Sequence, residues 1–150
     1  MRPLWTLSAP LALTRIIAVG YFILASALNA DGKSADAVPA VQKAIRLDPA
    51  LGDFFVQQLG FAYMKTGRYQ EAIAALKRYA ISRPNDFSSH VGLANSYIEL
   101  GRDQDARAEA AEVMRLNPQF TLPPPEKSPW DKDIALARHF DANLRKAGLK

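Results

Sequence analysis

The sequence predicts an all-α protein, a right-handed superhelix of about three helical hairpins closed by a C-terminal capping helix. The first observation is a repeat with a period of 34 residues that runs without a gap through residues 53–120. A fixed period of this length is typical of stacked helical hairpins. The second is a degenerate copy of the same repeat upstream, and the third is a proline-rich spacer followed by one amphipathic helix. A chain of 150 residues is long enough to bury one core of this kind.

Composition excludes several classes of function. The chain has no cysteine, which removes disulfides, thiolate metal sites and thiol nucleophiles. It has two histidines and no glycine-rich phosphate loop, HExxH or GxSxG motif, so we predict that it is not an enzyme and needs neither cofactor nor metal. The net charge of +4 is spread over the chain without a long basic run, so we expect no nucleic-acid partner.

Two clear repeats occupy residues 53–86 and 87–120. Both have a small residue at position 8, Tyr at 11, Gly at 15, Ala at 20 and Pro at 32: Gly60, Tyr63, Gly67, Ala72 and Pro84 in the first copy, and Ala94, Tyr97, Gly101, Ala106 and Pro118 in the second. We expect the glycine at position 15 to end each first helix in a left-handed turn, and the proline at position 32 to stop each second helix. These residues resemble the tetratricopeptide repeat, which implies a superhelical protein-binding module.

A degenerate copy of the repeat covers residues 18–51. Its small residues, glycine and proline keep the repeat positions: Ala25, Gly32, Ala37, Ala44 and Pro49. It departs at Leu28, where tyrosine is usual, and at Pro39, which lies too deep in the second helix for a first-turn proline. We therefore predict that this helix is kinked or starts late.

The C-terminal part contains an extended spacer at 121–128, rich in proline, and a capping helix at 129–148. We expect Ser128 to cap this helix, Pro129 to occupy its first position and Gly148 to end it. Its apolar residues fall on one side, as a cap on a stack of hairpins requires: Ile134, Ala137, Phe140 and Leu144.

The segment from Gly67 to Lys150 resembles one particular family among the proteins that carry this repeat. The repeat, the spacer and the ending Leu-Arg-Lys-Ala-Gly-Leu at residues 144–149 resemble the C-terminal tail of bacterial class III adenylate/guanylate cyclases that carry tetratricopeptide repeats. The resemblance implies the regulatory or scaffolding repeat part of an adenylate-cyclase-like protein, without its catalytic domain. No catalytic residue is carried over, and whether the chain is an independent protein or a fragment stays open.

Residues 1–17 are an N-terminal extension that leads into an apolar helix predicted over residues 10–30. From Ile16 to Leu28 this helix has no charge and is apolar all round, and its length suffices to cross a bilayer. Three coverings stay open for it. In the first, it is the first helix of the degenerate repeat. Its apolar surface is then hidden by its own hairpin, by residues 1–9 or by a second copy of the chain in a homodimer.

The two other coverings involve a membrane. The helix is a membrane anchor with Arg15 near one end, or a secretory signal cleaved after Ala27. If the helix belongs to the degenerate repeat, the protein is cytoplasmic. If the helix is a membrane anchor, the protein is a membrane-anchored repeat scaffold.

The resemblance also implies a concave groove for a protein or peptide ligand, lined by the first helices of the hairpins. Repeat positions 2, 5, 9, 12 and 13 correspond to Phe54, Gln57, Phe61, Met64 and Lys65, then to Ser88, Val91, Asn95, Ile98 and Glu99. The degenerate copy adds Val19, Phe22, Ser26, Asn29 and Ala30. This mixture of aromatic and amide side chains suits an amphipathic helix or an extended peptide.

The remaining candidate residues point away from specialised binding. A clamp for a terminal carboxylate, known in this superfamily, needs lysine at position 5, where Gln57 and Val91 stand. We expect His90 to be packed at a helix interface and His139 to reach solvent, and two histidines without a third ligand predict no metal site.

Overall fold

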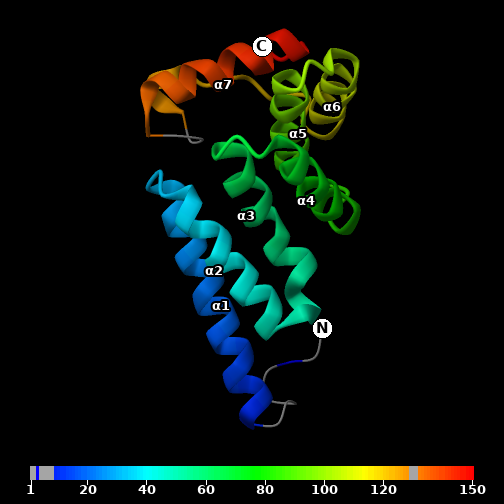
Figure 1. Ribbon diagram of the computed structural model, residues 1–150. Coiled ribbons are helices and arrows are strands. Elements are labelled where there is room, and N and C mark those ends of the chain that lie inside the picture. The colour runs from blue at the N-terminus through cyan, green and yellow to red at the C-terminus, as the bar shows by residue number, and fades with distance from the viewer. Residues whose placement is uncertain (1–2, 4–8, 129–131) are drawn as a thin grey trace.

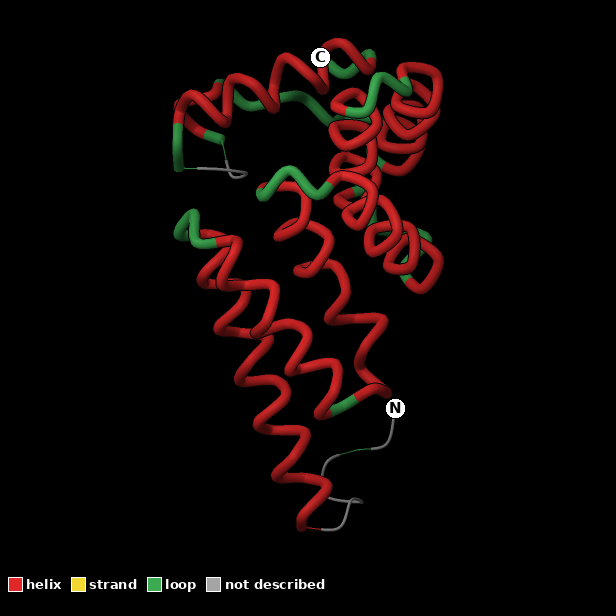
Figure 2. Tube along the Cα trace, viewed as in Figure 1, coloured by secondary structure: helices red, strands yellow, loops and turns green. Residues whose placement is uncertain are grey.

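The computed structural model describes residues 3, 9–128 and 132–150, and within these ranges it contains helices and loops but no strand (Figure 2). The all-α prediction is confirmed. The described α-helices, in chain order, are α1 (Ala9–Ala30), α2 (Ser34–Leu47), α3 (Gly52–Lys65), α4 (Tyr69–Ser82), α5 (Ser88–Glu99), α6 (Asp103–Leu116) and α7 (Ile134–Ala147). A short 3-10 turn, η2 (Pro49–Leu51), precedes α3. A second one, η3 (Pro125–Lys127), lies in the spacer.

The first six helices form three antiparallel hairpins that stack in order, α1–α2 on α3–α4 on α5–α6 (Figure 1). Each first helix is followed by a glycine with positive φ, +77° at Gly32 and Gly67 and +71° at Gly101. The left-handed turns expected at Gly67 and Gly101 are confirmed. Gly32 shows that the degenerate copy turns in the same way.

The second helix of each hairpin ends just before a proline, as the sequence predicts. The residue that precedes each proline has left the helical conformation, with φ between −133° and −138° and ψ between 67° and 84° at Asp48, Arg83 and Asn117. The proline ring disfavours the helical conformation in the residue before it.

Pro39 does not behave as expected, because α2 starts at Ser34 and continues through the proline to Leu47. The prediction of a late start is wrong, and the alternative, a kink at Pro39, stays a prediction. The backbone N–H groups of Asp36 and Ala37 both donate to the carbonyl of Lys33, so the first turn forms before Pro39 is reached. The proline removes only its own hydrogen bond, and the buried apolar face of α2, packed between α1 and α3, compensates for that loss.

Tyr63 and Tyr97 lie in equivalent surroundings, as the repeat register requires. Their exposed fractions are 8% and 2%, and each ring lies beneath a guanidinium five residues further on. The Cζ of Arg68 is 4.4 Å from the ring centre of Tyr63, and that of Arg102 is 4.7 Å from the ring centre of Tyr97. The 34-residue period is therefore a repeat in three dimensions as well as in sequence.

The C-terminal helix begins later than expected. The predicted cap, Ser128, follows η3 in an extended conformation, and Pro129 lies outside the described residues. Helix α7 begins at Ile134, where the carboxylate of Asp133 accepts hydrogen bonds from the N–H groups of the second and third helical residues. An aspartate immediately before the helix satisfies these donors directly, so it defines the start. Gly148, with φ +109°, ends the helix as predicted.

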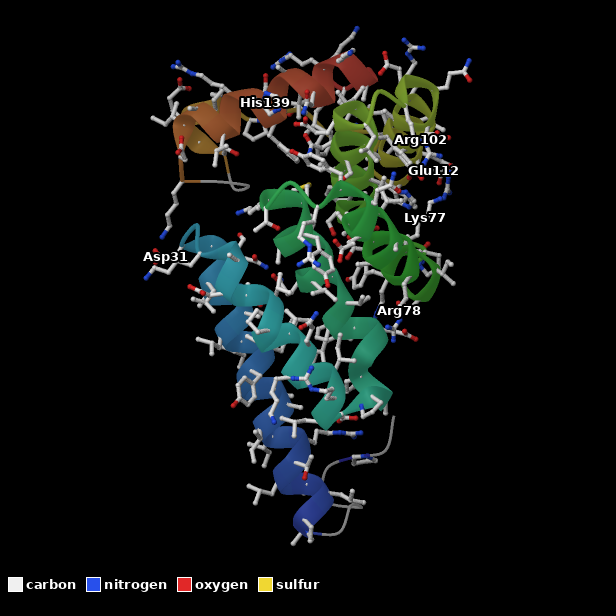
Figure 3. All side chains as sticks on the ribbon, in the orientation of Figure 1. Asp31, Lys77, Arg78, Arg102, Glu112 and His139 are labelled. Atoms are coloured by element: carbon white, nitrogen blue, oxygen red, sulfur yellow. The ribbon has the colours of Figure 1, made fainter. Side chains whose placement is uncertain are left out.

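Helix α7 lies across the end of the stack, over α5 and α6 (Figure 1). Its buried side is the predicted apolar face extended by Asn143 and Ala147, although Ile134 itself is 47% exposed. At its start, the ammonium of Lys132 lies 3.3 Å from the carboxylate of Asp31, at the tip of the α1–α2 turn (Figure 3). The segment that leads into α7 therefore contacts the first hairpin.

Helix α1 is long and apolar enough to cross a membrane, with a mean hydropathy of 2.0. Only 11% of its most apolar 18-residue window is buried inside the protein. The inner face, with Ala18 and Ala25 fully buried and Asn29 bonded to Gln58, packs on α2 and α3. The outer face is open.

Candidate functional site

The structure divides the ten predicted groove residues into three groups. Four are buried and serve helix packing: Met64, Val91, Asn95 and Ile98. Five are partly buried: Gln57, Phe61, Lys65, Ser88 and Glu99. Phe54 alone among the ten is well exposed, at 41%.

Contacts between neighbouring first helices close the middle of the predicted groove. The amide of Gln57 donates to the hydroxyl of Ser88 at 2.6 Å, joining α3 to α5. The ammonium of Lys65 donates to the backbone carbonyl of Asn29 at 2.9 Å. Phe61 lies against Gly92, where a Cβ would meet its ring at 3.2 Å. These side chains hold the hairpins together.

Helix α7 covers the far end of the groove. The amide of Asn143 donates to the side-chain oxygen of Asn95 at 2.9 Å and to the carboxylate of Glu99 at 2.8 Å. His139 pairs with the same carboxylate from the exposed side of α7 (Figure 3). Burial, followed by the charge of Glu99, raises the pKa of Tyr69 beside this contact. The cavity that remains here has a volume of only about 80 Å³, too small for a peptide.

The near end of the groove is open. A cavity of about 790 Å³ lies between α1, η2, the start of α3 and the end of α4. An adjoining hollow of about 630 Å³ shares Phe54, Ser82 and Arg83 with it and continues to Phe87 at the start of α5. Ligand sites in proteins are typically of this size and are mainly apolar. We call the two hollows together the Phe54 groove.

Three phenylalanines form the floor of the Phe54 groove. The ring centre of Phe22 lies 5.2 Å from that of Phe54 and 5.1 Å from that of Phe55. Phe55 is only 1% exposed and anchors the cluster, whereas Phe54 presents its ring to the cavity. Aromatic pairs at these separations hold each other in place, so the floor is formed before any ligand arrives.

The charged side chains at the rim of the Phe54 groove differ in whether they already have an ion-pair partner. Arg15 is neutralised by Asp48 at 2.5 Å, and both side chains are largely buried. Asp53 pairs with Arg78 at 2.6 Å. The guanidinium of Arg83 lies 5.3 Å from the ring centre of Phe54 and takes part in no ion pair among the described residues. Arg83 is therefore the cation that this rim offers to a ligand.

Sequence reasoning missed Arg83 and also Leu51, which lines the larger hollow, because they come from the ends of elements rather than from repeat positions on first helices. A basic residue before the proline that ends α4 carries no local signal of function. The ion pair between Arg15 and Asp48 joins positions 33 residues apart and depends on the hairpin itself.

The two histidines lie where the sequence predicts. His90 is largely buried, and its Nδ1 lies 2.6 Å from the carboxylate of Glu109 on α6. His139 is 61% exposed. Within the described ranges, no three His, Asp or Glu side chains gather as a metal site would require.

Comparison with known proteins agrees with this fold. Two family models, both described as tetratricopeptide repeat, match residues 18–51 and residues 58–119, which together make up more than half of the chain. The chain is therefore a tetratricopeptide-repeat protein. It is similar to the solved structure of a MamA point mutant, with 24% identity and a TM-score of 0.56 over 76% of this chain and 77% of that one. No curated protein matches the chain.

Proposed function

We propose that this tetratricopeptide-repeat protein is a noncatalytic interaction module that binds a protein or peptide ligand in the Phe54 groove. The observation that carries the proposal is the exposed ring of Phe54, at the point where the two hollows meet. The far end of the concave surface is occupied by α7, so the near end is the part with room for a ligand. Proteins with this repeat are in general interaction modules without catalysis.

The lining indicates the chemistry of the ligand. An apolar side chain fits against Phe22 and Phe54, where burial of aromatic surface supplies most of the affinity. A carboxylate one or two residues away pairs with Arg83, whose guanidinium is already held over the ring. The ligand class is therefore a peptide with an apolar anchor next to an acidic residue.

A peptide selection tests this function. The full chain is used to select binders from a library of displayed random peptides, and the affinity of the selected peptides is measured by calorimetry. Phe54→Ala is expected to raise Kd about tenfold or more, and Arg83→Gln to raise it selectively for peptides with an acidic residue.

The control is Ile81→Ala, which removes an apolar side chain that is 83% exposed on α4 and lines neither hollow. This variant is expected to bind as the wild type does. Selected peptides whose affinity is insensitive to Phe54→Ala would refute the groove.

The same proposal includes a more specific role, which is to act on a catalytic domain. The ending at residues 144–149 and its resemblance to cyclase tails support a module that regulates or scaffolds an adenylate-cyclase-like catalytic domain. In that setting the Phe54 groove would take a segment of the catalytic domain. A bacterial class III cyclase domain with such a tail, mixed with this chain, is expected to bind it, and to bind the Phe54→Ala variant less tightly.

Location is also part of the proposal, with a cytoplasmic module as the first candidate. Packing of the α1 inner face on α2 and the ion pair between Arg15 and Asp48 favour a helix that belongs to the first hairpin. The alternative is a scaffold anchored through residues 10–30, which the hydropathy of α1 favours. Carbonate washing of membranes from cells that express the full chain separates the two, because only an anchored chain stays with the lipid.

A further inference from the structure

The outer face of α1 is apolar and carries no charge. Seven residues lie on it, within about a third of the helix circumference at 100° per residue: Leu13, Ile16, Ile17, Gly20, Ile23, Leu24 and Ala27. The five leucines and isoleucines are between 43% and 60% exposed. A patch of this kind marks an interaction surface.

Gly20 lies at the centre of this face. A glycine within a helix is destabilising relative to alanine, and a Cβ added at Gly20 would meet nothing within 4 Å. Packing inside the chain therefore gives no reason for a glycine at this position. Close approach of the backbone of another helix would explain the glycine. Contact with lipid chains would not, because they adapt to any side chain.

The face has the same pattern in both directions from Gly20. At equal distances before and after it stand Ile17 and Ile23, then Ile16 and Leu24, then Leu13 and Ala27. Two copies of α1 related by a two-fold axis at Gly20 and packed antiparallel would bring each of these residues opposite its counterpart. A two-fold interface needs this self-complementary pattern.

Charge agrees with the antiparallel arrangement. The first turn of α1 has no acidic residue and its last turn has no basic one, so neither end of the helix dipole is compensated within the helix. Antiparallel packing brings Asp31, which lies just after the C-terminal end and pairs within its own chain with Lys33 and Lys132, beside the first turn of the other copy. Each positive N-terminal end then lies next to a carboxylate.

We propose that this chain forms a homodimer in which the α1 helices of two copies pack antiparallel, with Gly20 at the two-fold axis. The outer face of α1 is thereby buried against its own copy. The surface is separate from the Phe54 groove except at Ile23, which contributes to both, so the dimer and the proposed peptide binding are tested by different residues.

Sedimentation of the full chain over a range of concentrations tests the dimer. Wild type is expected to show a monomer–dimer equilibrium, and Ile17→Glu to sediment as a monomer. Ile81→Glu, which makes the same change at an exposed position on α4, is expected to dimerise as wild type does. A wild type that stays monomeric, or an Ile17→Glu variant that dimerises normally, would overturn the proposal.

Gly20→Leu separates the dimer from a membrane. The larger side chain is expected to weaken dimerisation at least tenfold, although it raises helix propensity and its Cβ meets nothing within 4 Å in a single copy. In a bilayer the same change would strengthen binding, which flotation with phosphatidylcholine vesicles measures. Tighter vesicle binding together with unchanged self-association would contradict the dimer.

Cross-linking tests the orientation, because the native chain has no cysteine. A mixture of Ile16→Cys and Leu24→Cys copies is expected to form disulfide-linked heterodimers under mild oxidation. Either variant alone is expected to cross-link far less, since its two thiols would lie about 12 Å apart along the helix axis. Efficient cross-linking of Ile16→Cys alone would indicate parallel helices and refute the arrangement.

Discussion

The side chain of Leu76 on α4 lies directly against the backbone of Gly60 on α3, so that a Cβ at residue 60 would be 2.7 Å from both Cγ and Cδ2 of that leucine. Leu76 is fully buried and also reaches Gly92 on α5, where a Cβ would be 2.8 Å from its Cδ1. One leucine thus joins two hairpins through two glycines.

Gly60→Ala is therefore expected to destabilise the fold by about 1–3 kcal/mol through overpacking. Urea unfolding followed by circular dichroism measures the loss. In the background of Leu76→Ala, which makes room, the same change is expected to cost much less. Equal costs in the two backgrounds would show that the contact does not limit the packing.

The turn glycines give a second prediction, because their constraint is backbone conformation rather than space. A Cβ at Gly32, Gly67 or Gly101 would meet nothing within 4 Å, yet all three have positive φ. Changing each to alanine is expected to cost about 1–2 kcal/mol, and changing each to asparagine less. A small cost at Gly32 alone would mean that the first hairpin does not turn as the other two do.

Tyr79 and Asp86 give a prediction about pH. The phenol donates to the carboxylate at 2.8 Å, and burial, then this hydrogen bond, raises the pKa of Tyr79 to about 12. The fold thus favours the neutral phenol, whose contribution is complete below pH 10 and is lost as pH rises from 10 to 12. Wild type is expected to exceed Tyr79→Phe by about 1 kcal/mol near neutral pH and to lose this advantage over that alkaline range.

The carboxylate of the same pair titrates in the opposite range. Burial acts to raise the pKa of Asp86, but hydrogen bonds from the hydroxyl and backbone N–H of Ser88 and from Tyr79 outweigh it and lower the value below 3.8. Stability from this carboxylate is present above that pH and is lost on acidification. Asp86→Asn is expected to be less stable than wild type at neutral pH, and the difference is expected to shrink in acid. A difference independent of pH would contradict this assignment.

Asn95 and Asn143 give a prediction about the cap. Both are buried, and their side chains join α5 to α7. Asn143→Leu is expected to cost about 1–3 kcal/mol, because the side-chain oxygen of Asn95 is left without its donor. Replacing both asparagines with leucine is expected to recover the part of that loss that comes from Asn95, but not the hydrogen bond that the carboxylate of Glu99 also loses. A double variant as unstable as the sum of the two single variants would show that the amides do not act as a pair.

Most of the repeat architecture could be predicted because it depends on local backbone chemistry. Glycines at fixed spacing produce left-handed turns, prolines stop helices, and Tyr63 and Tyr97 keep equivalent places. The late start predicted from Pro39 is wrong because tertiary packing of α2 outweighs one missing hydrogen bond.

The site was harder to predict. Repeat positions indicate which side of a helix faces inward, but they do not show that α7 covers Asn95 and Glu99. They also omit Arg83, whose position depends on how the end of α4 meets the start of α3. These features arise between elements distant in sequence, and no local pattern encodes them.

Native-state hydrogen exchange on the full chain tests most directly the claim that three stacked hairpins, the degenerate first one included, form one folded unit. Amides in α1 and α2 are expected to be protected through the same cooperative opening as those in α3 and α4. Free exchange throughout α1 and α2, with protection confined to residues 52–147, would contradict it.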